Sequence, residues 1–161
     1  MQEFEIDVSG HDLLSKDYVI CIANKNGIIR GFKFDENLIY SLSYRYSQDF
    51  YKYKKSKKGK SLFKVRLYSI VIYYLFQSLE IKGELSLKVC KDFEGRENDI
   101  RENFRFFLGN KLNLNINERI YFVKFDKDSI ADRYAFLMRK DKKDKMNTYI
   151  KLNLEDLEKW L

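Results

Sequence analysis

The sequence predicts one α/β domain, residues 1–161, built on a mixed β-sheet. Three strand-like runs joined by short connections open the chain, and helical and strand periodicities alternate after them. Strands joined by tight turns pair antiparallel, whereas strands joined through a helix pair parallel. The order β-β-β-α-β-α-β-α therefore gives both kinds of pairing, with helices flanking the sheet. A chain of this length supports one such core.

The first three strands are predicted near the N-terminus. In FEIDVSG, residues 4–10, apolar and polar residues alternate as in a strand, and the final Ser-Gly favours a turn. In residues 17–34, two β-rich runs flank Asn26 and Gly27, a pair that adopts the positive φ angles of a tight hairpin turn. Three consecutive strands therefore open the sheet.

The middle of the chain combines a basic stretch with an apolar periodicity. Residues 37–50 fit either a short helix or part of a long loop. The segment YKYKKSKKGK, residues 51–60, carries six lysines and is predicted to be a solvated, mobile basic loop. Over residues 61–79 apolar residues recur at helical spacing, with Ser61 as N-cap. The β-branched cluster SIVIYY within this segment favours a strand, but the length of the segment favours a helix.

Strand and helix patterns alternate through the second half of the chain. Residues 84–93 and 119–128 alternate as strands, and residues 100–108 show the spacing of an amphipathic helix. Residues 129–143 carry helix signals: a Ser start, one apolar face and a basic C-terminal end. The tail, residues 147–161, is predicted as a short extended piece followed by one or two helical turns.

Composition narrows the expected setting and partners. The net charge of +7, from 31 Lys+Arg and 24 Asp+Glu, suits a polyanionic partner without requiring one. Cys21 and Cys90 lie in apolar runs without zinc-ligand spacing, which predicts reduced buried thiols and a cytoplasmic location. No apolar run reaches the ~20 residues of a membrane span, and the N-terminus lacks the pattern of an export signal. Neither a membrane partner nor export is expected.

Acidic residues stand where the elements end. Asp7 lies in an otherwise apolar strand, where a buried carboxylate costs free energy unless it has a partner, a proton or a metal ion. Asp92 lies near the end of the strand-like run of residues 84–93, and Asp132 lies early in the helix predicted from residue 129. Each also has an ordinary explanation, because Asp is a common turn residue and Asp132 could pair with a basic side chain on its own helix.

This order of elements resembles the ribonuclease-H-like superfamily, whose nucleases hold carboxylates on the first strand, at the end of the fourth strand and on the last core helix. Asp7, Asp92 and Asp132 fall at these three places. The pattern is most similar to an uncharacterised family of that superfamily that opens with Ile-Asp-Glu-Ser-Gly. The matching segments are IDVSG, in which Val8 replaces the family's Glu, DFEGREND and SIADRYAF; the resemblance spans residues 4–140.

The resemblance implies a nuclease that hydrolyses phosphodiester bonds with Mg²⁺ or Mn²⁺. Two carboxylates about 4 Å apart repel by ~4 kcal/mol at an effective dielectric near 20, and a divalent cation relieves this repulsion. Such cations prefer oxygen ligands and bridge phosphate oxygens. By the resemblance, Asp7 contacts two ions and Asp92 and Asp132 hold one each, with Glu94 and Asp128 as reserve ligands.

Nucleic acid is the expected partner, as RNA, DNA, a hybrid or a branched junction, and a homodimer is left open. Lysines in a flexible arm contact phosphates, and interleaved tyrosines offer surfaces for base stacking, although such a run is as often only a solvated loop. The predicted nucleic-acid-binding residues are Tyr51, Lys52, Tyr53, Lys54, Lys55, Lys57, Lys58 and Lys60.

A second interpretation is a catalytically inactive ribonuclease-H-like module that binds nucleic acid or a protein partner. Residues 61–79 carry no acid at all, although many ribonuclease-H-like enzymes place a glutamate on that helix. Under this interpretation the lysines matter and the acids do not. A structural or regulatory protein without a nucleic-acid role is the third alternative. His11, the only histidine, is predicted to be a surface loop residue.

Overall fold

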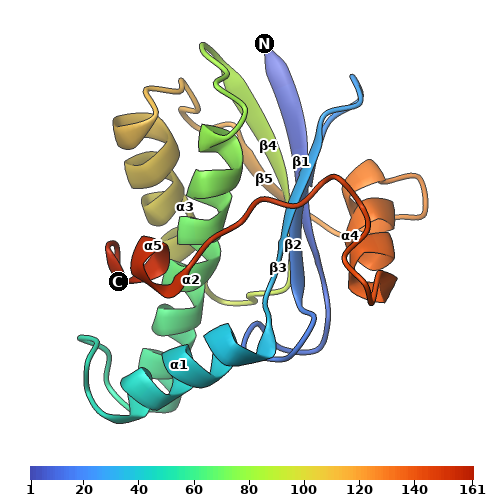
Figure 1. Cartoon of the computed structure of the whole chain (residues 1–161). Helices are drawn as coiled ribbons and strands as arrows, with labels where there is room; N and C mark the ends of the chain where they lie inside the picture. Colours follow the sequence, from blue (N-terminus) through green and yellow to red (C-terminus); the bar gives the residue numbers. More distant parts are fainter.

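A five-stranded mixed sheet forms the centre of the computed structural model, which describes all residues 1–161 (Figure 1). The strands are β1 (Gln2–Ser9), β2 (Val19–Ala23), β3 (Ile29–Lys33), β4 (Leu85–Cys90) and β5 (Ile120–Val123). Their order across the sheet is β3-β2-β1-β4-β5. β2 pairs antiparallel with β1 and β3, whereas β4 pairs parallel with β1 and β5. The predicted mixed α/β sheet is confirmed.

The predicted hairpin joins β2 to β3. The side chain of Asn24 organises its turn, because Oδ1 accepts hydrogen bonds from the backbone N–H groups of Asn26 and Ile28, both at 3.0 Å. Gly27 adopts a φ of 86°, a left-handed conformation that glycine enters without a side-chain clash. The turn chemistry at Asn26 and Gly27 therefore acts as the sequence indicates.

Alternation along β1 separates its apolar and acidic residues onto two faces of the sheet. Phe4 and Ile6 are fully buried in the main core, where the Phe4 ring meets Phe76 at a centroid distance of 5.1 Å. Side chains on a strand alternate between faces, so Asp7 points to the other side. Its antiparallel partner Cys21 packs there among the residues under α4.

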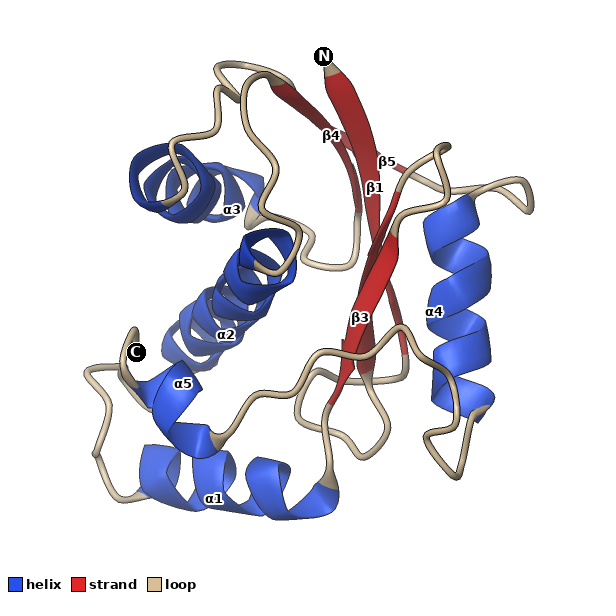
Figure 2. Ribbon diagram, turned by 45° about the horizontal axis from the view of Figure 1, so that its top comes forward, coloured by secondary structure: helices blue, strands red, loops and turns tan.

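Four helices cover one face of the sheet and one helix covers the other (Figure 2). On the first face lie α1 (Glu36–Ser47), α2 (Lys57–Gln77), α3 (Glu97–Phe104) and α5 (Leu154–Glu158). On the second face α4 (Ile130–Lys140) packs against β1, β2 and β3 but not against β4 or β5. The outer half of that second face is therefore not covered by a helix.

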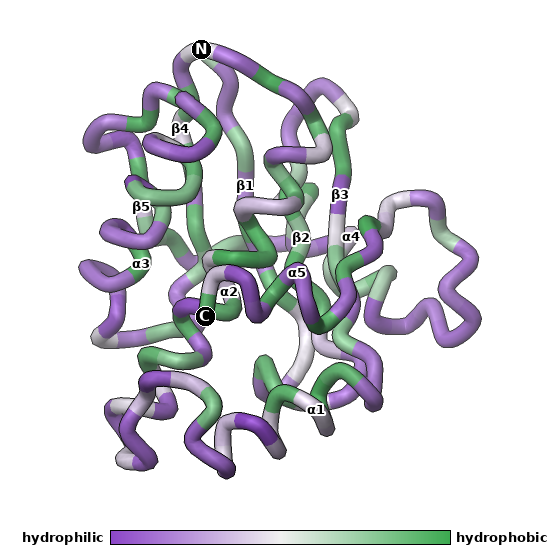
Figure 3. The backbone as a smooth tube through the Cα atoms, turned by 60° about the vertical axis from the view of Figure 1, so that its left-hand side comes forward, coloured by the Kyte–Doolittle hydropathy of each residue, from purple (hydrophilic) through white to green (hydrophobic).

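α2 is the central helix of the larger layer. It contacts β2, β3, α3 and α5, and most residues from Phe63 to Phe76 are buried. A helix surrounded by protein is apolar on nearly every side. This environment explains the cluster SIVIYY, whose β-branched residues suit a buried helix as well as a strand. Figure 3 shows hydrophobic residues running through the neighbouring strands as well.

Two predicted segments differ from the structure in the basic region. Residues 37–50, left open between helix and loop, contain helix α1, whose N-cap Asp35 accepts a hydrogen bond from the Leu38 N–H. α2 begins at Lys57 rather than at Ser61, because Ser56 serves as its N-cap and accepts from the Gly59 N–H at 3.0 Å. The predicted basic loop 51–60 is therefore a loop only as far as residue 56.

The later elements are of the predicted type, but some of them begin or end at other residues than predicted. The helix predicted over 100–108 comprises α3 and a π-helical continuation, η1 (Arg105–Lys111). In the tail, Tyr149 forms a parallel bridge with Gly31 of β3, and α5 starts with a capping box between Asn153 and Asp156. None of the helices combines the length and the apolar character that crossing a bilayer requires.

Gly59 fixes how closely the segment before α2 packs against the helix. A Cβ atom on Gly59 would lie 1.9 Å from the Lys54 carbonyl oxygen, so Gly59→Ala must displace residues 52–56. We expect a loss of ~1–3 kcal/mol in the free energy of unfolding, the usual range for overpacking. Urea denaturation measures it, with Gly109→Ala as the control, because a Cβ at Gly109 meets nothing closer than 4.0 Å. Equal stabilities of the two variants would show that the segment yields freely.

Candidate functional site

Asp7 is a buried carboxylate near the C-terminal end of β1. Only 6% of the residue is exposed, and its Oδ1 accepts a hydrogen bond from the backbone N–H of Val8 at 2.8 Å. No Lys, Arg or His forms an ion pair with it. The strand thus holds a carboxyl group in a fixed orientation, and no cationic side chain neutralises its charge.

Glu5, two residues earlier on the same face of β1, docks the start of α4 onto the sheet. Its Oε1 accepts hydrogen bonds from the N–H groups of Ile130 and Ala131 at 2.9 and 3.2 Å, and from the Ser129 hydroxyl at 3.1 Å. A carboxylate at a helix N-terminus is stabilised by the helix dipole. The Ser129 Oγ accepts in turn from the N–H of Asp132, which fixes the first turn of the helix over β1.

The carboxyl groups of Asp7 and Asp132 meet at this junction. They lie close enough to share a hydrogen bond, which requires a proton on one of them. The pKa of Asp7 is raised to about 7, mainly because burial desolvates the carboxyl group; the neighbouring Asp132 also raises it, and the hydrogen bond from the Val8 N–H lowers it. Asp132 itself is exposed, so the pair opens to solvent on the α4 side. The pair holds a proton or accommodates a cation.

Cys90 and Tyr68 lie behind the pair. Cys90 is the last residue of β4, and its buried thiol lies near Asp7. Burial strongly raises the pKa of this thiol, so it stays protonated at neutral pH. Tyr68 of α2 is fully buried, and its hydroxyl lies next to Cys90. The side of the site that faces α2 is therefore a neutral thiol and a phenol rather than a third carboxylate.

Asp92 does not join the pair. It follows β4 in an exposed turn, where the protein on one side desolvates the carboxyl and raises its pKa. Tyr18 lies near both Asp92 and Asp7. The three predicted carboxylates are thus neighbours, but only two are in contact. No group of three His, Cys, Asp or Glu side chains is assembled around one metal position.

The reserve ligands lie elsewhere. Glu94 is exposed in the turn between β4 and α3, and Asp128 lines a separate hollow beside Glu5. His11 is exposed, as predicted. Glu5, which the sequence analysis did not single out, positions Asp132; the signal that could have found it is its two-residue spacing from Asp7.

The six predicted lysines between 52 and 60 are exposed, but their tyrosines are not free stacking surfaces. Tyr51 is 9% exposed, stacks on Phe63 and donates its hydroxyl to Glu158 Oε2 at 2.6 Å. Tyr53 is half-buried against the same ring. The predicted base-stacking role is therefore wrong for Tyr51, because its ring packs inside the core.

The lysine-rich start of α2 lies at the same end of the molecule as Asp92. The Lys64 Nζ pairs with Asp12 Oδ2 at 2.9 Å, in the loop that follows β1. The Arg96 Nε donates to the Ser61 hydroxyl at 3.1 Å, which ties the turn carrying Asp92 to α2. Basic side chains of α2 and of the turn before α3 therefore lie at the end of the molecule that carries Asp92.

The fold and the site together define an α/β protein in which a buried carboxyl group, Asp7, lies beside an exposed one, Asp132, at the junction of β1 and α4. No protein-family model matches the chain, and no curated protein matches it either. The function is therefore argued from the geometry.

Proposed function

We propose that the chain is a divalent-metal-dependent nuclease with a ribonuclease-H-like fold. The observation that carries the proposal is that Asp7 and Asp132, two carboxyl groups from separate elements, lie side by side with no basic side chain between them. Antiparallel pairing of the first three strands followed by two parallel additions supports the ribonuclease-H-like assignment.

The donor set fits Mg²⁺ or Mn²⁺. Both carboxyl groups offer oxygen, and no Lys, Arg or His forms an ion pair with Asp7. Mg²⁺ is commonly held by one or two carboxylates together with substrate phosphates, so the third carboxylate is not required for binding. Asp7 and Asp132 would hold the ion, with Asp92 at the rim.

Each side chain around the pair has a defined task. A bound divalent ion supplies Lewis acidity toward a phosphodiester. The Val8 N–H orients Asp7, and Glu5 anchors α4 so that Asp132 lies beside Asp7. The buried Tyr68 and Cys90 exclude water from the α2 side. The proton shared by the pair must leave before both oxygens can bind a cation.

Substrate binding would rest on the exposed lysines before and within the first turn of α2. Such contacts reach phosphates rather than base edges, so binding is weakly sequence-selective and weakens with salt. RNA, DNA, hybrids and junctions are all candidates. Because both cysteines are free thiols, we place the protein in the reducing cytoplasm.

The second candidate function is an inactive module on the same scaffold. It is favoured by Tyr68, which lies where α2 approaches the site and provides no carboxylate, and by the separation of Asp92 from the pair. Under this function nucleic acid still binds to the lysines, but Asp7 has no catalytic role.

A cleavage screen separates the two functions. Labelled single-stranded and duplex RNA, DNA and hybrids are incubated with the protein in Mn²⁺ or in EDTA, together with Asp132→Asn. Glu102→Gln is the control, since Glu102 is exposed on α3 and its side chain forms no ion pair. The nuclease predicts cleavage by the unmutated protein and the control only. Equal cleavage by Asp132→Asn would exclude the carboxylate pair as the active site.

Metal affinity is expected to rise with pH through the pKa of Asp7. Below a pH of about 7 a proton occupies the pair and competes with the cation, whereas above it both groups are ionised. The Kd for Mn²⁺ should fall by up to ~10-fold per pH unit below the pKa and level off above it. Calorimetric titration between pH ~6 and ~8 measures this. A Kd that does not change with pH would place the binding ligands elsewhere.

A further inference from the structure

A hollow of about 390 Å³ is lined by residues of α2, α3 and the C-terminal segment. These elements lie on the sheet face away from α4 (Figure 2). Of its lining, Lys52 and Tyr53 belong to the predicted nucleic-acid-binding residues. The polar and aromatic residues that line it are Lys52, Tyr53, Arg66, Asp99, Asn103 and Trp160.

Arg66 is a half-buried cation without an anionic partner. Its Nε donates to the Trp160 carbonyl at 2.9 Å, its Nη1 donates to Asn103 Oδ1 at 2.8 Å, and the guanidinium lies 4.6 Å from the centroid of the Phe107 ring. No Asp or Glu forms an ion pair with it. A partly desolvated charge is costly when unpaired, so an anion in the hollow would be stabilised.

The remaining lining also favours an anion. Asp99 is the acidic side chain in the lining, and it pairs with Arg96 at 3.6 Å. Lys52 is exposed at the mouth and forms no ion pair. Burial raises the pKa of the Tyr53 hydroxyl, which therefore stays protonated as a donor at neutral pH. Two cations and a hydroxyl thus face a space with one already paired acid.

A second hollow of about 290 Å³ continues the first, since both share Lys52, Tyr53 and Leu62. It lies at the N-terminus of α2, where the first turn has no acidic residue. Lys54 and Lys58 complete its basic lining, and no Asp or Glu lines it. The two hollows form a basic groove along the start of α2.

We propose that this basic groove binds phosphate groups of a single-stranded nucleic acid, with Arg66, Lys52 and the Tyr53 hydroxyl holding one phosphate and Lys54 and Lys58 another. With volumes of about 390 and 290 Å³, the two hollows lie near the lower bound of ligand sites, ~300 Å³. Basic grooves of this kind track the backbone of single strands. The hydrogen bond from Arg96 to Ser61 joins α2, which lines the groove, to the turn that carries Asp92.

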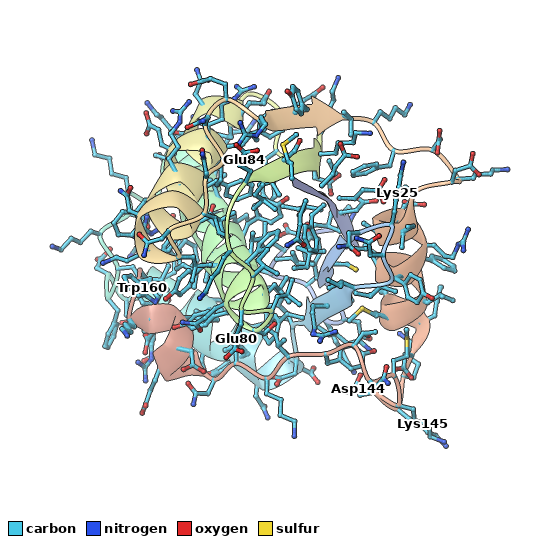
Figure 4. The ribbon with its side chains drawn as sticks, turned by 90° about the horizontal axis from the view of Figure 1, so that it is seen from above. Lys25, Glu80, Glu84, Asp144, Lys145 and Trp160 are labelled. Atoms are coloured by element: carbon cyan, nitrogen blue, oxygen red, sulfur yellow. The ribbon has the colours of Figure 1, made fainter.

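The inference deepens the proposed function by naming the form of its substrate, but binding is measured without cleavage. Labelled single-stranded RNA and DNA of ~12 nucleotides are titrated with protein in EDTA, with fluorescence anisotropy as the readout. Lys52→Glu is expected to weaken binding ~10-fold and to lower the salt slope by about 1–2, whereas Lys145→Glu, with the same charge change on the far side of the molecule (Figure 4), is not. Arg66→Lys keeps the charge but loses the planar fork, and should also weaken binding.

Trp160 gives an independent readout, because it is the only tryptophan and lines the hollow (Figure 4). Its fluorescence should change with the single strand at the same Kd as the anisotropy. Equal weakening by Lys52→Glu and Lys145→Glu would overturn the proposal, as would tighter binding of duplex, of free nucleotide, or of polyglutamate at matched charge.

The outcomes separate this inference from the nuclease. If Asp7→Asn binds single strands like the unmutated protein and no variant cleaves, the groove stands and the nuclease fails. If Lys52→Glu binds normally while cleavage depends on Asp7, the nuclease stands and the groove is overturned.

Discussion

Asp7→Asn is expected to abolish metal-dependent cleavage and at the same time to stabilise the metal-free protein above neutral pH. Changing groups that only orient metal ligands already costs ~10- to 100-fold, so loss of a ligand should reduce cleavage by more than ~100-fold. The opposite effect on stability follows from the protonation of the carboxyl group.

The sign of the stability effect is set by the raised pKa. An unfolded Asp loses its proton near 3.8, whereas the folded Asp7 keeps it up to about 7. The folded state therefore binds more protons between these values, and stability falls as pH rises through that window. Above it the ionised group costs on the order of 2 kcal/mol, after allowance for its contact with solvent. The Asn amide is neutral and can donate to Asp132.

Thermal unfolding in EDTA measures this gain. Asp7→Asn should melt about 5 °C higher than the unmutated protein near pH 8, and the difference should shrink near pH 5, where Asp7 is protonated. Glu102→Gln is again the control. A variant that melts lower at both pH values would mean that the Asp7 carboxylate is a structural partner of its neighbours rather than an unneutralised charge.

Phe63→Ala is expected to cause the largest loss of stability. Phe63 is fully buried at the start of α2 and holds three tyrosine rings at centroid distances of 4.7 to 5.5 Å. Truncation of a buried Phe to Ala costs ~3–5 kcal/mol, because packing is lost and a cavity remains. Tyr51 and Tyr53 would lose their support, so the basic groove should also bind nucleic acid less tightly.

Urea denaturation tests this expectation, with Phe136→Ala as the matched control. Phe136 is half-exposed on α4, and its truncation should change the free energy of unfolding by less than ~1 kcal/mol. A similar small change for Phe63→Ala would show that the aromatic cluster can collapse around the space, and that it does not fix the segment before α2.

Local patterns predicted the sheet because each strand has a clear period and the Asn26–Gly27 turn has strong local chemistry. The starts of helices were harder. A run of lysines indicates solvent exposure, and Lys57, Lys58 and Lys60 are indeed exposed, but from the first turn of a helix whose cap is Ser56. Exposure and helical backbone are compatible, so charge alone could not place the boundary.

The candidate site was predicted only in part for a related reason. Asp7 and Asp132 lie on regular elements, so strand alternation and helix capping determine where they point. Asp92 lies on a turn, whose path depends on tertiary contacts such as the bond from Arg96 to Ser61. The role of Glu5 also depends on the docking of α4, because its partners lie more than a hundred residues away.

Metal-dependent melting near pH 8 tests the carboxylate pair most directly. The unmutated protein, Asp7→Asn, Asp132→Asn and Glu102→Gln are each melted in EDTA and in Mn²⁺. A ligand that binds only the folded state stabilises that state, so Mn²⁺ should raise the melting temperature of the unmutated protein and of Glu102→Gln. Neither Asp variant should respond. An unchanged melting temperature in the unmutated protein, or an equal rise in Asp7→Asn, would contradict a metal site at Asp7 and Asp132.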